Sequence, residues 1–91
     1  MQLEAEFTTE PFEGEGDPPP HAVAALEVVR AAGVECDFGP LGTRIAGDGP
    51  VVLKALQDVM ATALDRGATR VTMQVEVVAD GSDPTGGGRD E

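Results

Sequence analysis

The chain has 91 residues, and 6 Lys and Arg against 17 Asp and Glu give it a formal net charge of −11 at pH 7. A chain of this length folds as one small domain with a thin core, so association with further copies would help to stabilise it. A surface this negative repels phosphate backbones and anionic lipid headgroups, which argues against nucleic acid and membranes as partners. The charge suits a cationic or neutral ligand better, although solubility alone also accounts for it.

The single cysteine, Cys36, cannot form a disulfide within the chain. The N-terminus has no secretory signal pattern, and no apolar run approaches the length of a membrane span. We therefore expect a cytoplasmic protein.

The first half of the chain alternates between strand and helix patterns. Apolar and acidic residues alternate in LEAEF, residues 3–7, which predicts a strand with one buried face. The Pro- and Gly-rich segment 10–20 predicts a long loop, and the apolar spacing that follows predicts a helix near residues 18–32. Gly33 supplies the left-handed residue that ends such a helix. Renewed alternation in VECDF, residues 34–38, predicts a second strand.

The second half repeats this order. The turn GPLG at residues 39–42 predicts a hairpin, with residues 43–47 as its return strand. The clearest helix is expected at residues 49–66, closed by Gly67. Its apolar stripe comprises Val52, Leu53, Leu56, Val59, Met60, Ala63 and Leu64. Residues 70–78 alternate again and predict a fourth strand, whose buried face carries Val71, Met73, Val75 and Val77.

This order of elements predicts the fold. Strand, helix, strand, strand, helix, strand is the pattern of an α+β ferredoxin-like βαββαβ sandwich, an antiparallel four-stranded sheet with two helices on one face. We assign this domain to residues 1–79. The tail, residues 80–91, has no apolar residue and is rich in Gly and Asp, which predicts disorder.

The sheet face opposite the helices should carry the polar residues of each strand. These are Glu4, Glu6, Thr8, Glu35, Asp37, Arg44, Thr72, Gln74 and Glu76. Antiparallel sheets often leave one such face solvated. Alternatively, this acidic face is where an oligomer partner closes a pocket that attracts a cation or binds a polar ring through its edges. The sequence leaves both interpretations open.

Signatures of catalysis are weak. His21, the only histidine, follows three prolines at a helix start and has no Ser or Cys nucleophile near it in sequence, so we expect an exposed helix terminus. Cys36 alternates with Val34 and Phe38, which predicts a small core residue rather than a reactive thiol. An acylphosphatase-like hydrolase would need an Arg–Asn pair, and the chain contains no Asn. We therefore expect a protein that is not an enzyme and has no catalytic residues.

Signatures of metal binding are weak as well. The chain has no CxxC motif and no His/Cys cluster, which disfavours a soft-metal carrier. The acidic segment 13–17 could bind a hard cation weakly, but a solvated loop is the commoner outcome. We therefore expect no metal site and no resident cofactor.

Three short motifs follow one another along the chain. They are Pro40-Leu41-Gly42-Thr43, Ile45-Ala46-Gly47 and Gly67-Ala68-Thr69-Arg70-Val71. Through these motifs and the elements around them, residues 3–79 resemble the small thiamine-binding proteins of the YkoF-like family. The resemblance implies a ferredoxin-like fold, assembly of subunits through their sheets into homodimers or homotetramers, and non-catalytic binding of thiamine or its hydroxymethylpyrimidine part.

The resemblance also suggests where a ligand would bind. Thr43 is the one ligand contact carried over from a matching motif. Thiamine carries a thiazolium cation and an aminopyrimidine ring, so a site needs a carboxylate, a hydroxyl and an apolar wall. On chemical grounds, Asp37, Glu6 or Glu35 could supply the carboxylate, and Phe38 with Met73 the wall. The alternative is a structural or regulatory ferredoxin-like oligomer with a different ligand or none.

Overall fold

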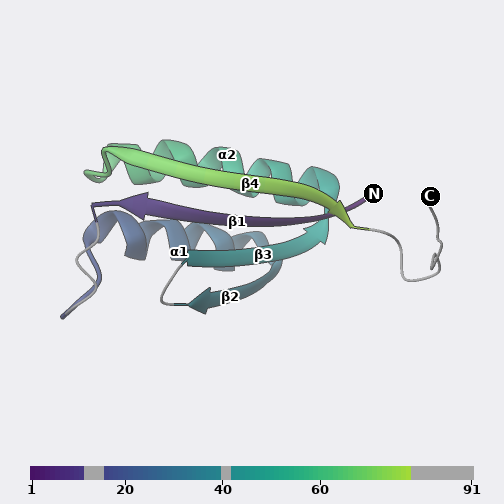
Figure 1. Cartoon of the computed structure of the whole chain (residues 1–91), viewed down its shortest axis with the longest axis horizontal. Coiled ribbons are helices and arrows are strands. Elements are labelled where there is room, and N and C mark those ends of the chain that lie inside the picture. The colour runs from purple at the N-terminus through teal and green to yellow at the C-terminus, as the bar shows by residue number, and fades with distance from the viewer. Residues whose placement is uncertain (12–15, 40–41, 79–91) are drawn as a thin grey trace.

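The computed structural model describes residues 1–11, 16–39 and 42–78 and has the predicted order of strands and helices. The elements are β1 (Gln2–Glu10), α1 (Pro20–Ala32), β2 (Glu35–Gly39), β3 (Gly42–Asp48), α2 (Gly49–Asp65) and β4 (Arg70–Val78). The strands form one antiparallel sheet in the order β2-β3-β1-β4, and both helices cover the same face of it (Figure 1). The ferredoxin-like fold is confirmed.

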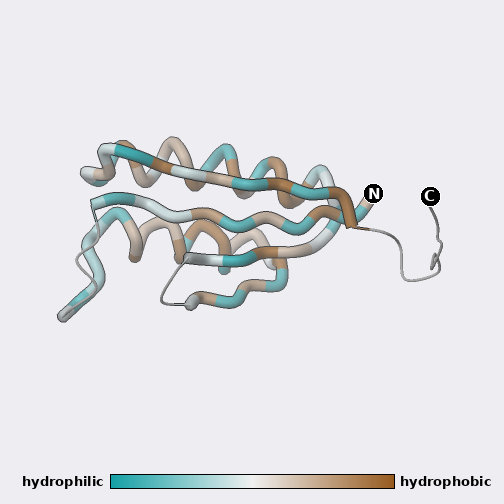
Figure 2. Tube along the Cα trace, viewed as in Figure 1, coloured by the Kyte–Doolittle hydropathy of each residue, from teal (hydrophilic) through white to brown (hydrophobic). Residues whose placement is uncertain are grey.

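The core lies between the sheet and the two helices. Every second residue of β1 points into it, so that Leu3, Ala5 and Phe7 are buried. α1 contributes Ala25 and Val29, and α2 contributes a longer row of apolar residues. That row is Val52, Ala55, Leu56 and Val59. Figure 2 shows the apolar positions recurring along both helices and along β4.

Prolines and a glycine define the ends of α1. Pro19 is extended, with φ −68° and ψ 158°, and Pro20 occupies the first helical turn, where its missing N–H is not needed. The helix therefore begins at Pro20, two residues later than the predicted start. Gly33 ends it in the left-handed conformation, with φ 77°, and donates its N–H to the Arg30 carbonyl at 3.2 Å.

Part of the predicted apolar stripes is not buried. Leu53, Met60 and Leu64 of α2 and Val75 and Val77 of β4 are all exposed, although Val75 and Val77 pair with buried β1 residues and lie on the helix side of the sheet. The prediction was wrong for these residues because β4 is an edge strand, and no element in the described part of the chain covers its outer side. We call these five residues the α2–β4 flank.

Cys36 is exposed, so the prediction of a core residue was wrong. β2 is the other edge strand, and its residues Glu35–Phe38 are all exposed, Phe38 by 48%. The alternation in the sequence correctly indicated a strand. However, α1 makes few contacts with this strand, so its apolar side chains are left largely uncovered.

Several predictions fall on residues 12–15, 40–41 and 79–91, which lie outside the described part of the chain. They include the disordered tail, most of the acidic segment 13–17, and the Pro40-Leu41 turn. No helix in the described ranges is long and apolar enough to cross a membrane.

Candidate functional site

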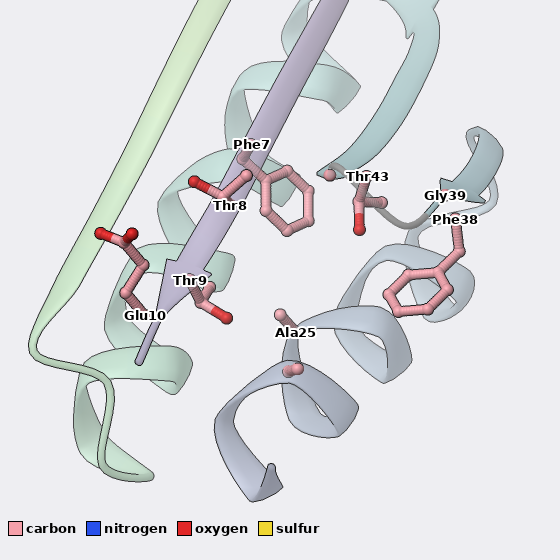
Figure 3. Close-up of a pocket in the computed structure, with 10 residues that line it drawn as sticks. Phe7, Thr8, Thr9, Glu10, Ala25, Phe38, Gly39 and Thr43 are labelled. Atoms are coloured by element: carbon pink, nitrogen blue, oxygen red, sulfur yellow. The ribbon is translucent and has the colours of Figure 1, made fainter. Parts of the chain in front are cut away.

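A cavity of about 200 Å³ lies between one end of the sheet and the first turns of α1 (Figure 3). It is lined by Phe7, Thr8, Thr9 and Glu10 of β1, Ala22 and Ala25 of α1, Phe38 and Gly39 of β2, and Gly42 and Thr43 of β3. α1 contributes only methyl groups at Ala22 and Ala25, so the helix cannot fill the space in front of the sheet. Small residues on one wall therefore create the cavity.

A row of three side chains forms the wall on the sheet. Thr43 of β3 pairs with Phe7 of β1 on one side and with Phe38 of β2 on the other. Cross-strand partners project to the same face, so a hydroxyl lies between two aromatic rings. Gly42 allows this close approach, because a Cβ at this position would lie 3.1 Å from the Phe7 carbonyl oxygen and 3.2 Å from the Thr8 methyl group.

The Thr43 hydroxyl is buried and has no partner among the residues that the structure describes. Thr43 is only 5% exposed, and its Oγ1 forms no hydrogen bond with any residue in the described ranges. In Figure 3 this oxygen points into the space between the strands and α1. A buried hydroxyl without a partner costs about 1–3 kcal/mol, which a ligand that hydrogen-bonds to it would recover.

The hydroxyl of Thr9 is also buried, and it forms a hydrogen bond with His21. His21 Nδ1 lies 2.8 Å from Thr9 Oγ1, and His21 Nε2 lies 2.9 Å from the Pro11 carbonyl oxygen. His21 is 3% exposed, so the predicted exposed helix terminus was wrong. The reason is that β1 continues to Glu10, beyond the predicted end at Phe7, and brings Thr9 and Pro11 to the start of α1.

The predicted ligand contacts are divided between the two faces of the sheet. Thr43 and Phe38 line the cavity. Met73 pairs with Phe7 and is on the same face, but it does not line the cavity. The carboxylates of Glu6, Glu35 and Asp37 belong to the opposite face, because Glu6 and Asp37 pair with Arg44, and Glu35 lies two residues before Asp37. The structure does not bring these residues together, and their role as ligand contacts stays a prediction.

The open face of the sheet is acidic but partly neutralised. Arg44 Nη1 lies 3.0 Å from Glu4 Oε2, and Arg44 Nη2 lies 4.0 Å from Glu6 Oε1.

Across residues 1–11, 16–39 and 42–78, no three His, Cys, Asp or Glu side chains are grouped so that they could hold a metal ion. Although Cys36 is exposed, the protein atoms around its thiol remove part of its hydration, and this partial burial raises the pKa of the thiol. The charge of Arg30 opposes this shift, and the charge of Asp37 adds to it. The thiol is therefore held in its protonated, less nucleophilic form.

The sequence interpretation missed Thr9 and Glu10 as residues that line the cavity and His21 as the hydrogen-bond partner of Thr9. The alternation Leu3, Ala5, Phe7 continues to Thr9, so the period of two could have placed Thr9 on the buried face. For His21 no local signal exists, since its partners are 12 and 10 residues away in the sequence.

Comparisons with known proteins agree with this fold. The family described as thiamine-binding protein matches residues 5–83. A domain of unknown function from Bacillus cereus is 25% identical, with 89% of this chain and 78% of that chain covered and a TM-score of 0.66. A protein from Thermotoga maritima, described as acting in thiamine biosynthesis or salvage, is 15% identical and shares the fold, with 93% and 90% covered and a TM-score of 0.64. Curated proteins gave no significant match.

The family match extends over most of the chain and includes all three motifs of the sequence analysis. The predicted resemblance is thereby confirmed, and the chain belongs to the family of thiamine-binding proteins.

Proposed function

We propose that this protein binds thiamine, or its hydroxymethylpyrimidine part, in the cavity between β1, β3 and α1, without catalysing a reaction on it. The observation that carries this proposal is the Thr43 hydroxyl, which is buried at the cavity and has no partner in the described chain. The aromatic rings of Phe7 and Phe38 on either side of it offer apolar contact to the faces or edges of a small ring. Membership of the thiamine-binding family supports the ligand class.

The size of the cavity favours one ring over two. Its volume of about 200 Å³ is below the roughly 300–1,000 Å³ of sites that enclose a drug-sized ligand. We therefore place the pyrimidine ring inside and the thiazolium ring at the rim. The net charge of −11 gives the surroundings a negative potential that attracts the thiazolium cation.

The residues around the cavity are poorly suited to catalysis. Thr9 and His21 are within hydrogen-bonding distance, as a nucleophile and its base would be. However, the other ring nitrogen of His21 faces a neutral carbonyl, not a carboxylate that would stabilise an imidazolium ion. We therefore assign this pair a role in binding.

Calorimetric titration with hydroxymethylpyrimidine, thiamine and thiamine phosphates tests the proposal. We expect saturable binding of the first two and weaker binding of the phosphates, because each phosphate adds negative charge against an acidic protein. Absence of binding by all of them would leave the alternative function, a structural or regulatory oligomer with a different ligand or none.

We also propose that the protein is a homo-oligomer, a homodimer or a homotetramer, assembled through its sheets. Two copies stacked through their open faces would bring together the carboxylates of Glu35, Asp37 and Glu76, all exposed on that face. The free edge of β4 avoids this repulsion. It is nine residues long and contains no proline or lysine, the usual devices that protect an edge strand from pairing.

The sequence of β4 is complementary to itself. If two β4 strands pair antiparallel about a two-fold axis at Met73, Val71 lies opposite Val75 of the second copy, and Arg70 lies opposite Glu76 of the second copy. The same pairing brings the exposed α2–β4 flanks of the two copies together. The flank carries no charge, although the protein as a whole is strongly acidic. We therefore favour an edge-to-edge dimer that continues the sheet from one subunit into the next.

Location and other partners stay predictions from the sequence. We expect the protein to act in the cytoplasm. We expect neither nucleic acid nor membranes as partners, because its net charge of −11 repels both kinds of anionic surface.

A further inference from the structure

The hydrogen bond between Thr9 and His21 determines which kind of hydrogen bond Thr9 can form with a molecule in the cavity. We infer that His21 fixes the direction of the Thr9 hydroxyl hydrogen, so that Thr9 only accepts hydrogen bonds from a molecule in the cavity. Thr9 is then a specificity-determining residue and His21 its positioning residue. The assignment of a pyrimidine as the molecule rests on the proposed function, whereas the direction of the hydroxyl does not.

The partner of His21 Nε2 determines which ring nitrogen carries the hydrogen. His21 Nε2 is 2.9 Å from the carbonyl oxygen of Pro11, and a carbonyl oxygen has only lone pairs to offer. Nε2 must therefore carry the hydrogen and donate it. The opposite tautomer would set two lone pairs against each other at this distance and leave both atoms unsatisfied inside the protein.

A neutral imidazole has one hydrogen to share between its two nitrogens. With that hydrogen on Nε2, Nδ1 has a lone pair and can only accept. Thr9 Oγ1, 2.8 Å from Nδ1, is then the donor of the second hydrogen bond. The chain of donors runs from the Thr9 hydroxyl to His21 and from His21 to the Pro11 carbonyl.

A charged ring would reverse the direction at Thr9, because both of its nitrogens would donate. No described carboxylate forms an ion pair with His21, and the residue is 3% exposed. Burial of a charge without a partner is strongly unfavourable. With a neutral ring, the Thr9 hydroxyl has its hydrogen committed to His21.

The Thr9 hydroxyl oxygen still has lone pairs, so it can accept a hydrogen bond from a ligand but cannot donate one. Thr9 lines the cavity, and in Figure 3 its hydroxyl oxygen points toward the space beside Ala25. Thr43, on the neighbouring strand β3, has no such constraint from the described residues and can either donate or accept. The cavity thus offers one fixed acceptor and one adaptable hydroxyl.

This arrangement selects a chemical class of ligand. A ring with an N–H donor satisfies Thr9, and a ring nitrogen or hydroxyl next to it can interact with Thr43. A 4-aminopyrimidine meets the requirement at Thr9 through its exocyclic amine. Its 4-oxo analogue carries its N–H on the ring nitrogen next to the carbonyl instead. In the same pose it would set its carbonyl oxygen against the Thr9 oxygen, which cannot donate, and the site would disfavour that pose.

The direction of the hydroxyl can be measured without a ligand. Because the chain has a single histidine, a long-range ¹H–¹⁵N spectrum at pH 8 reports His21 alone. We expect the Nε2–H tautomer, with a Nδ1 shift typical of an unprotonated nitrogen that accepts a hydrogen bond. In Thr9→Val the Nδ1 shift should move to that of a nitrogen without a donor, and in Thr9→Ser it should not. A Nδ1–H tautomer in the wild type would overturn the inference.

The selectivity is measured by calorimetry with the 4-amino and 4-oxo forms of hydroxymethylpyrimidine. We expect the wild type to prefer the amino form by about tenfold or more, the size of effect that one buried hydrogen bond produces. Thr9→Val and His21→Phe should reduce this ratio toward one, because the first removes the acceptor and the second frees the hydroxyl to donate. Thr9→Ser should retain it, as should Thr72→Val, the same exchange at an exposed β4 residue.

The two experiments separate failure of the inference from failure of the proposed function. If neither pyrimidine binds to the wild type, the proposed ligand is wrong, and the tautomer measurement still decides the direction of the hydroxyl. If both pyrimidines bind equally well, the ligand class stands and the inference is wrong. If His21→Phe does not fold, Thr9→Val and Thr9→Ser carry the test.

Discussion

Phe7 and Thr43 are direct cross-strand partners on β1 and β3, with both side chains on the helix side of the sheet. This pair places an aromatic ring beside a buried hydroxyl at the cavity. The Thr43 hydroxyl would form hydrogen bonds with the polar edge of a ligand, whereas the Phe7 ring would pack against its apolar surface. The contribution of Thr43 can therefore be separated from the shape of the cavity.

Thr43→Val should weaken binding of hydroxymethylpyrimidine by about 1 kcal/mol or more, because it removes one buried hydrogen bond and keeps the β-branched shape. The fold should remain intact, since the lost hydroxyl has no partner in the described chain. Calorimetry with the wild type and Thr72→Val as reference measures the change. Equal affinities of folded Thr43→Val and wild type would remove Thr43 from the site.

Thr9→Val should destabilise the protein even without a ligand. It leaves Nδ1 of the buried His21 ring without its hydrogen-bond partner, which costs about 1–3 kcal/mol. Thr72→Val, at an exposed position, should change the free energy of unfolding by no more than about 0.5 kcal/mol. Urea unfolding of the two variants in parallel makes the comparison. A loss of the same size in both would mean that the Thr9–His21 hydrogen bond contributes no stability.

Leu53→Lys and Val77→Lys should each weaken self-association, because they place a charge in the α2–β4 flank that the proposed dimer buries. Ala61→Lys is the matched control on the same helix, since residue 61 is exposed outside the flank. Sedimentation velocity over a range of protein concentrations gives the dimer affinity of each variant. A wild type that stays monomeric at tens of micromolar would contradict the assembly.

A charge exchange tests the register of the proposed β4 pairing. Arg70→Glu and Glu76→Arg should each weaken the dimer, because each sets two like charges opposite each other across the two-fold axis. The double variant should recover the affinity, since it restores opposite charges in the exchanged positions. If the double variant associates no better than the single ones, the strands pair in another register or not at all.

Cys36 should react slowly with thiol reagents at pH 7 in spite of its exposure. Its raised pKa leaves a smaller thiolate fraction than a free cysteine has, so the rate should rise steeply as the pH passes that pKa. Arg30→Gln should slow the reaction further, because Arg30 opposes the rise. In stability terms, the folded state favours the protonated thiol, an advantage that is complete below the pKa of the unfolded chain and is lost as the pH rises through the folded one. Rates with a chromogenic disulfide between pH 6 and 10 check both expectations.

Periodicity in the sequence was sufficient for the type and order of the elements. Leu3, Ala5 and Phe7 alternate on β1, and Val52, Leu56 and Val59 recur at helical spacing on α2, so each pattern identified its element and its buried face. The same patterns failed at the edges. They marked Leu53 and Val77 as buried, because a period shows which face is apolar and not whether another element covers it.

The site was predictable to a lesser degree. Thr43 was named from a matching motif and Phe38 on chemical grounds as an apolar wall, and both line the cavity. Thr9 and His21 meet because the end of β1 lies beside the start of α1. This is a tertiary contact between residues that are 12 positions apart, and no local pattern in the sequence indicates it. The carboxylates were chosen for their charge, and the alternation of the strands puts Glu6 and Asp37 on the other face.

The position of β1 has a consequence for the synthesis of the chain. β1 is made before the other strands of the sheet, yet its neighbours are β3 and β4, and its pairing with β4 joins Gln2 to Val78. While the chain grows on a ribosome, one edge of β1 stays unpaired until β4 has emerged. Contacts between such distant residues close slowly. The free edge of β1 is thus open to wrong pairing until all four strands of the sheet have been made.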